Sequence, residues 1–76
     1  MREVLEYIAR SLVDDPDAVR VEEHQSGRSL VLRLTVAPDD VGKVIGRGGR
    51  TARAIRDLVR ATGTRSGVTA VVEIVG

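Results

Sequence analysis

Residues 44–55 read Val-Ile-Gly-Arg-Gly-Gly-Arg-Thr-Ala-Arg-Ala-Ile, so three glycines within four positions interrupt an otherwise apolar run. A tight turn needs backbone φ values that side chains resist and glycine accepts. We therefore expect Gly46-Arg47-Gly48-Gly49 to join two short helices. The second helix should begin near Arg50, and the first N–H groups of a helix lack partners within it. Such an arrangement binds anions, phosphate above all.

Basic side chains surround this predicted turn. At 100° per residue, four arginines of the following helix fall within a wedge of about 120°, opposite its apolar positions. These are Arg50, Arg53, Arg56 and Arg60. Together with Lys43 and Arg47 they oppose a single acid, Asp57, between residues 43 and 60. A polyanionic backbone is the natural partner of such a segment.

Two other glycine motifs do not fit the segment. A Walker A loop needs Gly-x4-Gly-Lys-Ser/Thr after a strand, and that spacing is missing here. A dinucleotide fingerprint needs Gly-x-Gly-x-x-Gly within a βαβ unit, whereas Gly46–Gly49 lacks the last interval and follows a predicted helix.

Outward from the turn, the hydrophobic pattern predicts the order α-β-β-α-α-β in one domain, an α+β fold. Helices are expected at residues 2–13 and 50–62, together with a short helix that starts at residues 37–40 and ends at Gly46. Strands are expected at residues 18–24, 29–36 and 68–75. Helices packed on one face of a three-stranded sheet would bury the apolar stripes most simply.

Particular residues mark the boundaries and faces of these elements. Val4, Leu5, Ile8 and Leu12 form one stripe on the first helix, which Asp14-Asp15-Pro16 ends.

Farther along, Asp39 and Asp40 suit the N-terminal end of a helix dipole, and Gly63 suits the C′ position of the last helix. Leu30, Leu32, Leu34 and Val36 alternate on one face of the central strand. Val31, Val71 and Val75 are apolar on the opposite face, either as ordinary exposed valines or as part of an oligomer surface.

The composition narrows the functional classes. Residues 1–40 carry five Lys/Arg and nine Asp/Glu, whereas residues 41–76 carry seven and two, which predicts an anionic partner for the second half. The chain has no cysteine, and its single His24 is expected to be a surface residue. Asp14, Asp15 and Asp17 are expected to form a solvated turn rather than a cation site. We predict no catalysis, metal or cofactor, and a cytoplasmic location with no membrane insertion.

Val44-Ile45-Gly46-Arg47-Gly48-Gly49, followed by Ile55, resembles the Val-Ile-Gly-x-x-Gly signature of K-homology (KH) domains. Such domains clamp about four nucleotides of single-stranded nucleic acid with this loop. The predicted element order is similar to the type II, bacterial arrangement, and the whole chain resembles the small single-KH proteins of the KhpA (YlqC-type) family. We expect one KH domain over residues 1–76, with its core motif at about 29–76 and the GxxG loop at 46–49.

The resemblance implies a set of RNA-binding residues. Gly46 and Gly49 would let the nucleic-acid backbone approach, with Arg47 and Gly48 as the variable pair. Ile45 and Ile55 match core and groove aliphatics, and the other wall of the groove is expected at Leu32–Val36. The predicted RNA-binding residues are Lys43, Ile45, Gly46, Arg47, Gly48, Gly49, Arg50 and Arg53. Tyr7 is the only aromatic residue, so base stacking is unavailable and weak, poorly selective binding is expected.

The leading hypothesis is therefore a non-enzymatic binder of single-stranded RNA. The resemblance also implies an RNA chaperone in cell elongation and envelope homeostasis. It would act as a homodimer or with a larger KH-family protein of the KhpB type, also called Jag or EloR. One alternative is a protein-interaction module with the KH fold and little RNA binding. Another is a binder of single-stranded DNA.

Overall fold

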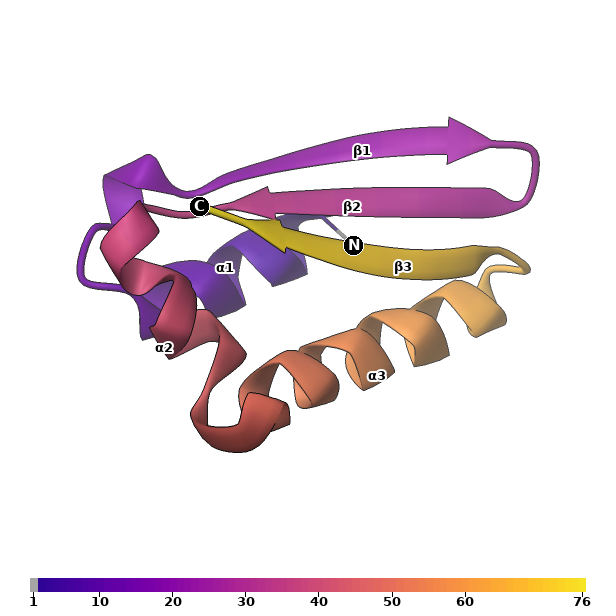
Figure 1. Ribbon diagram of the computed structural model, residues 1–76. Coiled ribbons are helices and arrows are strands. Elements are labelled where there is room, and N and C mark those ends of the chain that lie inside the picture. The colour runs from indigo at the N-terminus through magenta and orange to yellow at the C-terminus, as the bar shows by residue number, and fades with distance from the viewer. Residues whose placement is uncertain (1) are drawn as a thin grey trace.

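The computed structural model describes residues 2–76 and confirms the predicted α+β class and element order (Figure 1). Helices occupy Arg2–Leu12 (α1), Val41–Ile45 (α2) and Arg50–Arg65 (α3), and strands occupy Arg20–Ser26 (β1), Ser29–Thr35 (β2) and Thr69–Val75 (β3). Short 3₁₀ turns cover Pro16–Ala18 (η1), Pro38–Asp40 (η2) and Arg47–Gly49 (η3).

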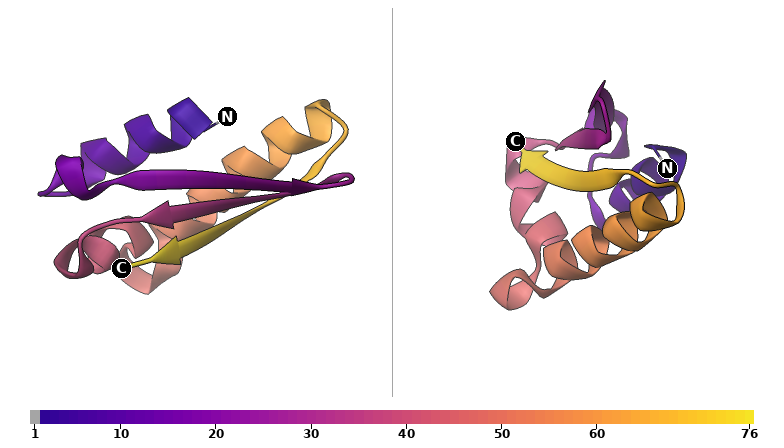
Figure 2. Two further views of the ribbon diagram at one scale, coloured as in Figure 1. Left: turned by 90° about the horizontal axis from the view of Figure 1, so that it is seen from above. Right: turned by 90° about the vertical axis from the view of Figure 1, so that its right-hand side faces the viewer.

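The three strands form one mixed sheet in the order β1-β2-β3. β1 and β2 make an antiparallel hairpin, in which Val21 lies opposite Leu34, and β2 and β3 pair in parallel. Because parallel neighbours need a crossover connection, α2 and α3 lie between β2 and β3 in the chain. All three helices lie on the same side of the sheet, and the turn between α2 and α3 projects away from it (Figures 1 and 2).

The core lies between the sheet and the helices. Alternate residues of β2 are almost completely buried, as the period-2 pattern predicts. α1 contributes Leu5 and Ala9 to this core, and α3 contributes Ile55 and Val59. The predicted stripe on α1 was therefore only partly right, because Val4 and Leu12 stay exposed beside the core instead of entering it.

The start of β1 differs from the prediction by two residues. Val19 is fully buried, yet it caps the η1 turn by donating its N–H to the carbonyl of Pro16 at 3.2 Å, and strand pairing begins only at Arg20. A buried valine in front of a strand looks like a strand residue in sequence, because burial and pairing produce the same apolar signal there.

The role assigned to Gly63 was wrong. α3 continues through Gly63 to Arg65, and the residue near its end with positive φ is Gly67, at +78°. Gly63 is needed for packing: a Cβ at this position would meet the Cβ of Ala70 at 2.9 Å and the carbonyl oxygen of Val68 at 3.1 Å. This glycine therefore allows α3 to lie close to the start of β3.

Candidate nucleic-acid interface

The GxxG turn, Gly46–Gly49, has the backbone geometry that the glycines predict. Gly46, Gly48 and Gly49 all adopt positive φ, at 76°, 64° and 76°. The turn is held by its own backbone, since the Gly46 N–H donates to the carbonyl of Gly42 at 2.9 Å and the Gly49 N–H donates to that of Gly46 at 3.1 Å. These bonds define the path of the chain from α2 into α3.

The glycines of the turn are required for different reasons. Gly46 combines φ 76° with ψ 170°, a region open essentially to glycine alone. A Cβ on Gly46 would also collide with the side chain of Thr51, including its Cβ at 2.8 Å. Gly48 and Gly49 have open space where a Cβ would stand. The solvent side of the turn is therefore bare backbone that a ligand could approach closely.

The N-terminus of α3 carries no side-chain cap. The expectation of unpaired amides here holds only in part, because the Arg50 N–H donates to the carbonyl of Arg47 and the Gly49 N–H is also used within the turn. The positive end of the α3 dipole still faces this turn without a carboxylate to neutralise it.

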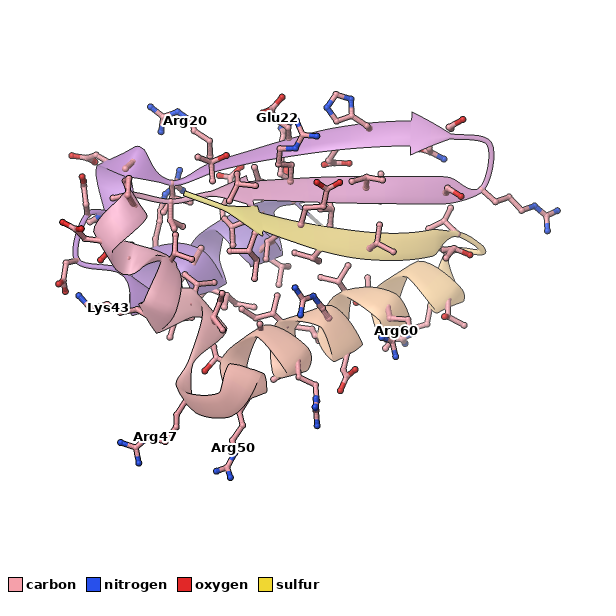
Figure 3. The ribbon with its side chains drawn as sticks, viewed as in Figure 1. Arg20, Glu22, Lys43, Arg47, Arg50 and Arg60 are labelled. Atoms are coloured by element: carbon pink, nitrogen blue, oxygen red, sulfur yellow. The ribbon has the colours of Figure 1, made fainter. Side chains whose placement is uncertain are left out.

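Ion pairing divides the basic residues into two groups. Within residues 2–76, Arg2 and Arg10 pair with Glu6, Arg33 with Glu73, and Arg60 with Asp57. The other group consists of basic side chains that have no hydrogen-bond or ion-pair partner within these residues: Arg28, Arg47, Arg50, Arg53, Arg56 and Arg65. Arg47 and Arg50 extend away from the sheet, on the side opposite Arg20 (Figure 3). Unpaired guanidinium groups thus gather at the GxxG turn and along α3.

Lys43 lies in a different environment from these arginines. Its Nζ is paired with a carboxylate oxygen of Asp14 and lies 3.4 Å from Oδ1 of Asp40. Hydrogen bonding to Asp14 raises the pKa of Lys43 above its ordinary value, against the opposing effect of partial burial. The charge of Lys43 is therefore balanced inside the molecule, whereas those of Arg47, Arg50 and Arg53 are not.

Asp40 is a buried carboxylate, with only 2% of its surface exposed. It lies at the N-terminal end of α2, as predicted, but its side chain does not cap the helix; its two oxygens accept the backbone N–H groups of Asp14 at 3.3 Å and Asp15 at 3.1 Å. Burial alone would raise its pKa, but these two hydrogen bonds and Lys43 outweigh burial and lower it. This Asp40 clamp fastens the loop after α1 to the start of α2.

The predicted groove wall at Leu32–Val36 was wrong. Leu32, Leu34 and Val36 are buried under the helices, and β2 is the central strand, so neither of its edges is open. The hollow beside α3 is instead lined by Arg56, Arg60 and residues 70–72 of the edge strand β3, with a volume of about 230 Å³. Of the two predicted aliphatics, Ile45 is 37% exposed next to the turn and Ile55 is buried.

An apolar depression between α1 and α3 was missed from the sequence. Two adjoining hollows, of about 240 and 230 Å³, share Ile8 and Leu58. Their lining residues are Val4, Leu5, Ile8, Leu12, Thr51, Ala54, Ile55, Leu58, Val59 and Thr62. We call this surface the α1–α3 trough. Val4 and Leu58 are exposed because α1 and α3 do not pack closely against each other. The spacing between two helices cannot be predicted from the local sequence pattern of either one.

A metal-holding cluster and a membrane-spanning helix are both absent from the described part of the chain. No group of three or more His, Asp or Glu side chains in residues 2–76 is placed to hold a metal ion. Over the same residues, no helix has both the length and the apolar character needed to span a membrane.

The αββααβ order, the mixed sheet and the bare GxxG turn before α3 together define a type II KH domain. The family model described as "KhpA/KhpB, KH domain" matches residues 2–74, and the chain belongs to this family.

Several curated relatives span nearly the same length. The chain is 55% identical over 65 residues to the RNA-binding protein KhpA of Halalkalibacterium halodurans, covering 86% of each chain. It is 49% identical over 75 residues to that of Clostridium acetobutylicum, covering 99% of this chain and 100% of the relative. The protein of the same name from Streptomyces coelicolor is 51% identical over 65 residues, covering 86% and 82%. No solved structure matches the chain significantly.

Proposed function

We propose that the chain binds single-stranded RNA, without catalysing a reaction, through the GxxG turn and the start of α3. The observation that carries the proposal is the cluster of unpaired arginines, Arg47, Arg50 and Arg53, beside a turn with no obstructing side chain. The name RNA-binding protein, which the relatives carry, supports RNA as the anion.

Each predicted residue then has a physical role. Gly46, Gly48 and Gly49 let the sugar-phosphate backbone approach the turn, Arg47, Arg50 and Arg53 neutralise phosphates, and exposed Ile45 offers an aliphatic contact to a base. Lys43 is the weakest of the predicted phosphate contacts, since a phosphate must compete with the carboxylates of Asp14 and Asp40.

Salt titration with a short single-stranded RNA tests this proposal. Three phosphate contacts predict a log–log salt slope of about −2, at ~0.7 per contact on a single strand. Arg47→Asp with Gly48→Asp should abolish binding. The matched control, Arg20→Asp with Ser26→Asp, makes the same change in net charge on the opposite face of the sheet and should retain most of the affinity (Figure 3). Unchanged binding by the loop variant would place the RNA on another surface.

Parallel titrations with single-stranded DNA of the same sequence test whether DNA, rather than RNA, is the preferred ligand.

We infer further that this domain acts in pairs, because a site without aromatic stacking binds weakly and a second domain raises the effective concentration. The α1–α3 trough is the surface that suits a partner, as Leu58 is 47% exposed in an apolar hollow. The partner would be a second copy of the chain or a larger KH-family protein of the KhpB type. This surface also supports the alternative of an interaction module with little RNA binding.

Solution mass measurements test the pairing. Leu58→Glu should convert a dimer into a monomer, whereas Val71→Glu, at a valine equally exposed (49%) on the outer face of the sheet, should not. A wild-type protein that stays monomeric and ignores the larger partner would contradict this part of the proposal. A cytoplasmic chaperone role in cell elongation and envelope homeostasis stays a prediction from family resemblance.

A further inference from the structure

Tyr7, the only aromatic residue of the chain, lies exposed on α1. It is 74% exposed and belongs neither to the core nor to the proposed RNA site. A buried aromatic side chain removes about 150–250 Å² from water, so the exposed fraction of Tyr7 still presents about 110–185 Å². The ring of Tyr7 is therefore the largest unused apolar group on the described surface.

One of the two hollows of the α1–α3 trough lies beside this ring. Val4, which lines the hollow, is three residues before Tyr7, and side chains at this spacing are neighbours on a helix surface. Tyr7 itself does not line the hollow, so it leaves the volume of about 240 Å³ open. A cavity of about 150 Å³ with apolar walls holds a benzene ring, so the hollow has room for the ring of a tyrosine.

The charges around the trough favour an uncharged occupant. No charged side chain is among the described residues that line its two hollows. A phosphate or a charged peptide finds no counter-charge there, whereas an apolar ring gains by leaving water. The net charge of the chain is only +1, so two copies repel each other little.

The exposed apolar area is also concentrated at this surface. Within residues 2–76, four of the seven exposed large hydrophobic side chains border the trough, namely Val4, Tyr7, Leu12 and Leu58. A stable dimer buries about 800 Å² on each partner, about one sixth of the 4962 Å² surface of this chain. The surface formed by α1 and α3 can therefore supply the apolar centre of an interface of ordinary size.

We propose that Tyr7 of each copy inserts into the hollow beside Val4 and Leu58 of a second copy, in a two-fold pair. The inference deepens the pairing in the proposed function and rests on it. A two-fold interface uses the same patch on both copies, so a ring and a hollow that lie side by side form the contact twice. Tyrosines held in pockets at the centre of an interface are among the residues that contribute most to affinity.

Sedimentation of the wild type, Tyr7→Ala and Tyr7→Phe tests the role of the ring. Such an anchor is worth about 30-fold in affinity per contact, so loss of both contacts should raise the dissociation constant of the dimer about 900-fold. Tyr7→Phe keeps the ring and should pair within about fivefold of wild type. Val71→Ala, on the outer face of the sheet, is the matched control and should pair as wild type. Tyr7 and Val71 are exposed, so folding should be unaffected, which circular dichroism would check.

A mixing experiment tests the reciprocal geometry. Thr62 is exposed at the rim of the hollow, so Thr62→Trp should fill the hollow without disturbing the core. When this variant is mixed with Tyr7→Ala, the tyrosine of the first meets the open hollow of the second, and one contact is restored. Native mass spectrometry should show the mixed pair forming about 30-fold more tightly than Tyr7→Ala pairs with itself.

The outcomes separate this contact from the proposed function. Wild-type pairing by Tyr7→Ala, or a mixture that pairs no better than either variant alone, would overturn the Tyr7 contact. The pairing itself would still stand if Leu58→Glu is monomeric. Loss of affinity for a four-nucleotide RNA by Tyr7→Ala, with pairing unchanged, would assign the ring to RNA instead. A monomeric wild type would overturn both the contact and the pairing, and would leave RNA binding at the GxxG turn to its own titration.

Discussion

Replacing the first glycine of the GxxG turn by alanine tests how that turn is built. At φ 76° and ψ 170°, Gly46 occupies a region where other residues cost about 1–3 kcal/mol. The added Cβ would also overlap the side chain of Thr51, and overpacking of this kind costs about 1–3 kcal/mol. We therefore expect Gly46→Ala to lower the free energy of unfolding by about 2–6 kcal/mol.

Two neighbouring glycines serve as controls for this variant. Gly48 needs positive φ but has open space around it, so Gly48→Ala should cost only about 1–2 kcal/mol. Gly42 lies inside α2 with ordinary φ and nothing within 4 Å, so Gly42→Ala should stabilise the protein by about 0.4–1 kcal/mol.

Urea denaturation of the three variants measures these differences. A domain of this size has a stability of about 4–11 kcal/mol, so Gly46→Ala would remove a large fraction of it and would lower Tm by about 4–8 °C for each kcal/mol lost. Equal losses for Gly46→Ala and Gly48→Ala, within about 0.5 kcal/mol, would refute the collision with Thr51 as a determinant of the turn.

Three further variants test other parts of the structure. The pKa of Asp40 is lowered in the folded state, so the ionised carboxylate stabilises the fold above pH 3.8, its ordinary pKa, and this stabilisation is lost as the pH falls through the lower pKa of the folded state. Asp40→Asn should therefore lower the free energy of unfolding at pH 7. In denaturation measured at a series of pH values, the variant should also lose less stability at acid pH than the wild type. Gly63→Ala should destabilise by about 1–3 kcal/mol in urea melts, because its Cβ would press on Ala70, and retention of full stability would contradict this packing. Asp57→Asn should strengthen RNA binding and steepen its salt slope by releasing Arg60, and weaker binding would mean that Asp57 positions Arg60 instead.

The parts of the fold that depend on local pattern were predictable. Alternation of Leu30, Leu32 and Leu34 indicates a strand with one buried face, and α1 ends at Leu12, shortly before the predicted stop at Asp14-Asp15-Pro16. The three glycines of the turn predicted positive φ, since that requirement belongs to the residue itself. Each of these signals acts over a few residues, so no knowledge of the rest of the chain is needed.

The parts that depend on distant contacts were not predictable. Gly63 resembles a helix terminator until β3 is known to lie against it, and Asp40 resembles a carboxylate that only complements a helix dipole until the loop at Asp14 and Asp15 reaches it. Lys43 likewise counts as a free cation until its carboxylate partners are placed. In each case the deciding partner is separated by several residues or more in sequence and is brought close only by the packing of the elements.

The parallel pairing of β2 with β3 has a consequence for biosynthesis. α2, the GxxG turn and α3 are all translated before β3, yet α3 buries Ile55 and Val59 in a core that β3 completes with Ala70 and Val72. Until β3 is available, α3 has no finished sheet to lie on, and non-local pairings of this kind form late. The GxxG turn and α3 are therefore fixed in place only when β3 joins the sheet beside β2.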